Sequence, residues 1–106
     1  MSYNRMKPAD RKAQILEAAI TVAVAKGFNN FRLVDIAEQA KCSTGSVIRY
    51  WATMVQVRRD VMRAAIKGAE QDSALLRIVA TGVALGDARC RKLSPELRAR
   101  AVATLG

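Results

Sequence analysis

The segment from Leu33 to Trp51 holds the side chains whose types and spacing indicate a chemical role. The pattern predicts a short helix over 33–40, a break at Lys41-Cys42-Ser43 and a second short helix over 44–51. The second helix begins with small polar residues, which let its free amides approach a phosphate or a base edge. Further along it, an arginine such as Arg49 can bond guanine through two acceptors, and Ile48 can meet a thymine methyl group. This combination predicts a helix-turn-helix unit that reads DNA.

Catalytic chemistry is poorly represented in the chain. It has no His, which is the usual general base and the commonest metal ligand. Cys42 and Cys90 are too few for a disulfide framework or a zinc site, and we expect both to be reduced. Cys90 stands between Arg89 and Arg91, where cations favour the thiolate, although an ordinary surface or half-buried Cys in a basic loop is the favoured interpretation. We expect no enzyme activity, no metal and no cofactor.

Composition favours binding over catalysis. The 106 residues carry 18 Lys and Arg against 9 Asp and Glu, a formal net charge of +9. Apolar residues make up 51%, enough for the core of one domain. No apolar run is long enough to span a membrane, and the first residues lack the apolar region of a secretory signal. We expect a cytoplasmic protein.

The rest of the chain supplies elements that would position the 33–51 segment. Apolar residues recur at three- and four-residue spacing and no strand alternation occurs, so the fold class is predicted to be all-α. Asp10, Ser43, Thr53, Asp72 or Ser73, and Ser94 are predicted N-caps. Gly27 should end the first helix, with Phe28 as a hydrophobic lid. Helices are predicted over 10–26, 33–40, 44–51, 54–70, about 73–85 and about 95–105.

Inward-facing residues follow from the same spacing. The first helix has an apolar stripe that ends at Ala23 and Val24, and the last helix continues to Leu105. Val47 and Trp51 should face inward together, and Gly82 should permit two helices to approach closely. The apolar residues of the 73–85 helix fit either the core or a dimer interface. They are Leu75, Leu76, Val79, Val83 and, less surely, Ile78.

Three parts of the chain are predicted. Residues 1–9 form a flexible basic arm, with Arg5 and Lys7 able to reach DNA or to remain idle. Residues 10–70 form a three-helix helix-turn-helix unit plus a long fourth helix. Residues 71–106 form a small tail of two short helices that completes the core or serves dimerisation.

Several pieces of the chain resemble, in order and spacing, the DNA-binding domain of the TetR family of transcriptional regulators. The resemblance covers roughly residues 11–66. The pieces are Ile15-Leu16-Glu17-Ala18-Ala19, Lys26-Gly27-Phe28, Asp35-Ile36-Ala37, and Ala40 with Ser43, Gly45 and Trp51.

The resemblance implies a dimer that binds a palindromic operator with its third helix, 44–51, in the major groove of double-stranded DNA. Ser46 stands where the family has a phosphate-contacting Thr or Ser, Tyr50 stands where an aromatic residue or His contacts DNA, and Trp51 matches a core aromatic. The predicted DNA-binding residues are Arg32, Lys41, Ser43, Thr44, Gly45, Ser46, Ile48, Arg49 and Tyr50.

Departures from the family pattern fall close to these residues. Arg32 replaces a Thr before the second helix, Lys41 replaces the turn Gly, and Ile48 replaces a Tyr. Cys42, Met54 and Ala23 also differ, standing for a small aliphatic residue, a Lys and a core Phe. Arg32, Lys41 and Arg49 could supply replacement charge.

The resulting hypothesis is a sequence-specific regulator, most simply a repressor. The tail is too short to enclose a drug-sized pocket unaided, so no small-molecule inducer is expected. Two alternatives stay open: a non-specific architectural protein, and an accessory factor whose basic surface meets an acidic protein. The cations Arg58, Arg59, Arg63 and Lys67 fit phosphate contact or a solvated helix face.

Overall fold

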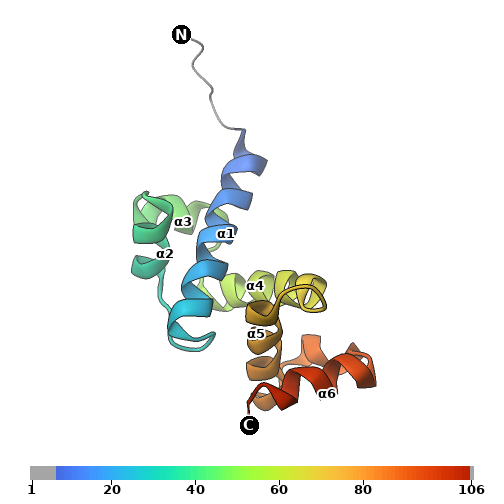
Figure 1. Ribbon diagram of the computed structural model, residues 1–106. Helices are drawn as coiled ribbons and strands as arrows, with labels where there is room; N and C mark the ends of the chain where they lie inside the picture. Colours follow the sequence, from blue (N-terminus) through green and yellow to red (C-terminus); the bar gives the residue numbers. More distant parts are fainter. Residues whose placement is uncertain (1–6, 106) are drawn as a thin grey trace.

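The computed structural model describes residues 7–105, and all of its regular elements in that range are helical, as the sequence predicts. Six α-helices and one short 3-10 helix follow one another, with turns between them (Figure 1). They are α1 Pro8–Lys26, α2 Leu33–Ala40, α3 Thr44–Tyr50, α4 Met54–Gly68, α5 Ser73–Ala84, the 3-10 helix η1 Ala88–Lys92, and α6 Pro95–Ala103.

The helices form two groups on either side of α4. In Figure 1, α2 and α3 lie beside α1, α4 crosses beneath them, and α5 and α6 lie on the far side of α4. α1 contacts α2, α4 and α5, and α6 packs on α5. The helix-turn-helix segment is therefore held at one end of the molecule and the tail at the other.

A single hydrophobic core runs through both groups. Ile15, Phe31 and Trp51 are buried in the helix-turn-helix group, and Val79 and Ala101 are buried in the tail. All five belong to one continuous cluster. Phe28 is 5% exposed and acts as the lid expected after Gly27. The tail thus completes the core of the same folded unit.

The start of the first helix differs from the prediction. α1 begins at Pro8, so Pro8 and Ala9 are helical rather than part of an arm. Lys7 is the N-cap residue, and Asp10 lies in the first turn without capping it. Proline suits this position because it has no amide hydrogen to leave unbonded. Residues 1–6, including Arg5 of the predicted arm, lie outside the described residues.

Other helix ends are shifted by one to two residues. α3 ends at Tyr50 with Trp51 as its C-cap residue, α4 ends at Gly68, and α6 ends at Ala103. The N-caps are confirmed where serine, threonine or aspartate was predicted, since Ser43, Thr53, Asp72 and Ser94 each accept a bond from a first-turn amide.

The apolar pattern is wrong at two helix edges. Val24 is 43% exposed and Leu105 is 55% exposed, although both were placed on inward stripes. Met62 was missed and is fully buried. Each helical residue advances the side chain by about 100°, so residues at the edge of a stripe face neighbours only where a partner helix happens to reach them.

The tail packs tightly around Gly82, as predicted for a close helix approach. A Cβ at this position would lie 2.5 Å from Met62 Cε and 2.9 Å from Cys90 Sγ. Cys90 is 2% exposed, so the expectation of a surface or half-buried Cys is wrong. Residues 88–92, expected as a loop, form η1 and carry this side chain inward.

The ionisation of Cys90 also differs from expectation. Burial raises the pKa of the Cys90 thiol, and the nearby Asp87 carboxylate raises it further, while Arg98 and Arg89 oppose this only partly. Proximity to cations in the sequence therefore does not favour the thiolate here, because burial outweighs the effect of the cations. Neither Cys90 nor Cys42 forms a disulfide.

Candidate nucleic-acid interface

α3 has one face fixed in the core and one face open. Val47 and Trp51, four residues apart, are both buried, which confirms their predicted orientation. Thr44, Gly45 and Arg49 are exposed, and Ile48 is 47% exposed. The side chains predicted to read DNA thus lie on the surface of a short helix that cannot rotate without exposing its aromatic anchor. We call the exposed residues of this region, Lys41, Ser43, Thr44, Gly45, Ile48 and Arg49, the reading face.

The first turn of α3 is closed by two serines. The Ser46 amide donates to Ser43 Oγ at 3.1 Å, and the two hydroxyls are also 3.1 Å apart. Ser46 is half-buried while Ser43 is exposed. Ser43 therefore has a structural task in addition to any contact with DNA. The Ser46 hydroxyl, expected on a phosphate, is held against the cap.

The turn between α2 and α3 is made by a residue in a conformation that favours glycine. Lys41 has φ 56° and ψ 49°, which is left-handed, and it is the only non-glycine residue among 7–105 with positive φ. The Cys42 amide then donates to the Ala37 carbonyl at 3.0 Å, which closes the end of α2. A left-handed L-residue costs roughly 1–2 kcal/mol. The chain tolerates this cost at the residue that replaces the family's turn glycine.

Trp51 fixes the end of α3 to α4. Its Nε1 donates to Asp60 Oδ2 at 2.8 Å, and Lys12 Nζ from α1 lies 5.4 Å from the ring centroid. Arg59 Nε lies 3.2 Å from the other carboxylate oxygen of Asp60. Burial works to raise the pKa of Asp60, but the bonds from Trp51 and Arg59 outweigh it and leave the pKa below its ordinary value.

The roles of Asp60 and Lys12 as partners of Trp51 were not predicted from the sequence. A signal for Asp60 was available, because a buried tryptophan requires an acceptor for its N–H and α4 carries one carboxylate. The contact of Lys12 depends on how α1 crosses α3, which spacing along the chain does not reveal. Residues of α1 and α4 thus both contact the Trp51 ring at the end of α3.

The start of α2 is held by Asp35. Its carboxylate accepts from Lys26 Nζ at 2.8 Å and from the Arg32 amide at 2.8 Å. The bond from Lys26, then that from Arg32, lowers the pKa of Asp35, and burial opposes them. The carboxylate therefore joins the end of α1 to the beginning of α2, which sets the position of the helix-turn-helix.

The structure gathers only part of the predicted site. Lys41 and Arg49 flank the start and end of α3, whereas Arg32 lies at the opposite end of α2, about 13 Å from Lys41 along the helix. Tyr50 is half-buried and packs beside Trp51, with ring centroids 6.1 Å apart, so its ring faces outward less than predicted. Arg32, Lys41 and Arg49 take part in none of the ion pairs formed by residues 7–105.

Two residues of α4, Val55 and Arg58, also lie next to this region. Val55, at the start of α4, is 71% exposed and is the most exposed large apolar residue of the described chain. Arg58 holds the turn before α2, with Nη2 3.5 Å from the Phe31 carbonyl and its guanidinium 5.7 Å from the Phe31 ring. Arg58 is thus occupied in the fold rather than standing as a solvated charge.

No helix among the described residues is long and apolar enough to cross a membrane. No group of His, Cys, Asp and Glu side chains within residues 7–105 is arranged to hold a metal ion.

Comparison with known families agrees with the geometry. Residues 15–61 match the family described as bacterial regulatory proteins, tetR family. A search of curated proteins returned no match to the chain. The matched residues begin within α1, include all of α2 and α3, and end within α4, so they contain both the reading face and its anchors. Over residues 15–61, the chain therefore matches the helix-turn-helix DNA-binding domain of the tetR family of bacterial regulatory proteins.

Proposed function

We propose that this DNA-binding regulator recognises a specific double-stranded sequence through the reading face and acts as a homodimeric repressor on a palindromic operator. The observation that carries the proposal is the asymmetry of α3. Its inner side is fixed by Val47 and Trp51, while Thr44, Gly45 and Arg49 are exposed and Ile48 is half exposed. The fold does not need these outer side chains, and their chemistry suits base edges and phosphates.

The glycine in α3 supports close approach to DNA. A Cβ at Gly45 would meet only Ser43 Oγ, at 3.6 Å, so nothing in the fold requires glycine there. Glycine in a helix costs roughly 0.5–1 kcal/mol relative to alanine. We infer that the missing side chain serves a ligand that approaches the backbone.

The conformation of Lys41 supports a role for its charge. Glycine would adopt the left-handed turn without strain, yet the chain places an exposed lysine there. In the proposal, Lys41 and Arg49 contact the DNA backbone and a base edge, and Arg32 supplies a more distant phosphate contact.

Dimerisation is proposed through the tail. Of the residues that fit either core or interface in the sequence, Leu76, Ile78 and Val79 are buried within one chain. Exposed apolar surface remains at Leu85 and Val102, which are 56% and 45% exposed. In the proposal a second copy covers this surface, and the two reading faces then have to lie about 34 Å apart to meet successive half-sites.

The proposal needs no small-molecule inducer. The large hollow between α1, α4 and η1, about 800 Å³, is open to solvent. Small-molecule sites usually enclose most of the ligand's surface.

A random-duplex binding selection combined with sedimentation of the protein tests the proposal. The expected result is an enriched palindrome and a dimer. A monomer that enriches a single half-site would contradict the dimer while keeping specific reading. Equal binding to all duplexes would contradict specific reading and favour the architectural alternative.

A further inference from the structure

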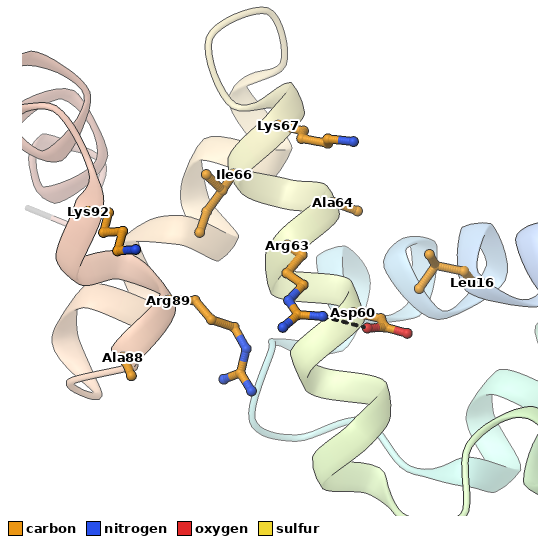
Figure 2. Close-up of a pocket in the computed structure, with 9 residues that line it drawn as sticks. All are labelled: Leu16, Asp60, Arg63, Ala64, Ile66, Lys67, Ala88, Arg89 and Lys92. Carbon is orange, nitrogen blue, oxygen red and sulfur yellow. Dashed lines mark ion pairs between the residues drawn. The ribbon is translucent and has the colours of Figure 1, made fainter.

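A groove separates the helix-turn-helix group from the tail. It has a volume of about 800 Å³ and lies between α1, α4 and η1 (Figure 2). The apolar residues of its lining, which we call the floor, are Leu16, Ala64, Ile66 and Ala88, and apolar surface predominates in the lining. The DNA-reading proposal does not use this groove.

Four cations belong to the same lining, and we call them the rim. Arg63 and Lys67 come from α4, and Arg89 and Lys92 come from η1. Figure 2 shows the guanidinium groups of Arg63, on α4, and Arg89, on η1, extending into the space between these two helices.

Little negative charge balances these cations. Arg63 is 3.9 Å from Asp60, the only acid in the lining, and Asp60 is already bonded to Trp51 and Arg59. Arg89 pairs with Asp87 at 3.1 Å, but its buried Nε has no partner among the described residues. Lys67 and Lys92 take part in none of the ion pairs of residues 7–105. The rim therefore keeps an excess of positive charge.

The shape and chemistry of the groove select among possible occupants. A second copy of this chain, with a net charge of +9, would bring further positive charge to the rim. The DNA backbone would satisfy the cations but would leave the apolar floor uncovered. A small molecule would stay largely exposed in an open groove.

A helix is compatible with the volume of the groove. Two turns of helix are about 11 Å long and about 10 Å wide, a volume close to that of the groove. A helix lying in an open groove is expected to remain half exposed, with apolar anchors at i, i+3, i+4 and i+7 against the floor.

We propose that this groove docks an amphipathic helix of a protein partner, with an apolar stripe on the floor and Asp or Glu residues beside the rim cations. The proposal stands apart from the reading of DNA, which uses a different face.

The test uses a fluorescein-labelled peptide of about 14 residues with leucines in a helical stripe and glutamates beside them. Two control peptides keep its charge: one has the same residues shuffled to destroy the stripe, and one has glutamine in place of leucine. Two protein variants lose the same charge. The groove variant is Arg63→Gln, Lys67→Gln, Lys92→Gln, and the reading variant is Arg32→Gln, Lys41→Gln, Arg49→Gln.

The expected result is that the two variants lose different functions, peptide binding in one and DNA preference in the other. The groove variant should bind the striped peptide at least about tenfold more weakly, and the reading variant less than about threefold more weakly. The reading variant should lose preference for the selected DNA, which the groove variant keeps. The fluorescence of Trp51, the only tryptophan, should change on peptide binding, because Asp60 both lines the groove and accepts its N–H bond.

Several results would overturn the proposal. Equal weakening of peptide binding in both variants, or equal binding of all three peptides, would show general charge attraction. Stronger binding of dodecanoate than of the peptide, lost only in the groove variant, would assign the groove to a small molecule. Loss of self-association in the groove variant would assign it to a second copy. Circular dichroism melts of both variants establish that each is folded, and the peptide-binding results do not depend on whether the DNA proposal succeeds.

Discussion

Gly45 in α3 and Gly82 in α5 show how differently two helices of this molecule use their surfaces. At Gly82 a Cβ would lie within 3 Å of Met62 and Cys90. At Gly45 it would meet only a serine hydroxyl at ordinary contact distance. Gly82 is required by packing inside the chain. Packing does not require glycine at position 45, so we look for the role of this glycine in contacts with another molecule.

The same contrast extends to the neighbours of each glycine. α5 is packed by α4, η1 and α6, and its residues Leu76, Val79 and Ala80 are buried. α3 has one buried face, and the turn before it contains the strained Lys41. The residues that pack α5 therefore differ from the exposed residues of α3 that we propose to read DNA, and substitutions can test the two sets separately.

The contrast predicts the largest loss of stability at Gly82. Gly82→Ala should lower the free energy of unfolding by about 2 kcal/mol, because two buried neighbours must move. Gly45→Ala should change it by less than about 1 kcal/mol, with helix propensity in its favour. Urea denaturation of both variants measures the difference. Equal effects of the two substitutions on the free energy of unfolding would contradict the conclusion that packing requires glycine in α5 but not in α3.

The second prediction concerns Trp51, which anchors the buried side of α3. Trp51→Phe keeps an aromatic ring but removes the bond to Asp60, so the free energy of unfolding should fall by about 1.5 kcal/mol. A double-mutant cycle with Asp60→Ala, which removes the acceptor, isolates this bond. Additive effects in the cycle, with no coupling between the two positions, would show that the bond contributes nothing.

Substitution of Lys41 should stabilise the protein, in contrast to substitution of Gly82 or Trp51. Lys41→Gly should raise the free energy of unfolding by about 1 kcal/mol, because glycine adopts the left-handed turn without strain. DNA binding should weaken in the same variant, since a phosphate contact is lost. Lys41→Ala is the matched control, which removes the charge and keeps the strain. A glycine variant no more stable than the alanine variant would show that the turn is unstrained.

Acid should weaken the anchors of α2 and α3, and this is the smallest effect expected. The pKa values of Asp35 and Asp60 are lowered in the folded state, so between the folded and unfolded values the unfolded chain binds more protons. Their contribution is present above about pH 4 and is lost as the pH falls below that. Denaturation midpoints from pH 7 to pH 3 measure it. In an Asp60→Asn variant the decline should be shallower, and an unchanged slope would contradict the role of this carboxylate.

Helix order, most N-caps and the inward pair Val47 and Trp51 could be predicted from the sequence, because spacing and capping chemistry are local. The tetR-type domain was also identifiable from residues alone, and the match over 15–61 confirms it. These features depend on neighbours within a few turns of the chain.

Long-range features were beyond local reasoning. The burial of Cys90 depends on η1 folding against Gly82. The groove between α4 and η1 arises from two segments more than twenty residues apart. Which of the predicted contacts reach DNA stays a prediction.

Arg49→Ala tests the central claim, that the outer side of α3 serves recognition rather than folding. Arg49 is exposed and unpaired among residues 7–105, so the free energy of unfolding should stay within about 0.5 kcal/mol of the wild type. The affinity ratio between a selected duplex and random DNA should fall by about 5- to 150-fold, with preference lost at one base pair of each half-site. An unchanged ratio and an unchanged preferred sequence in a folded variant would contradict the account.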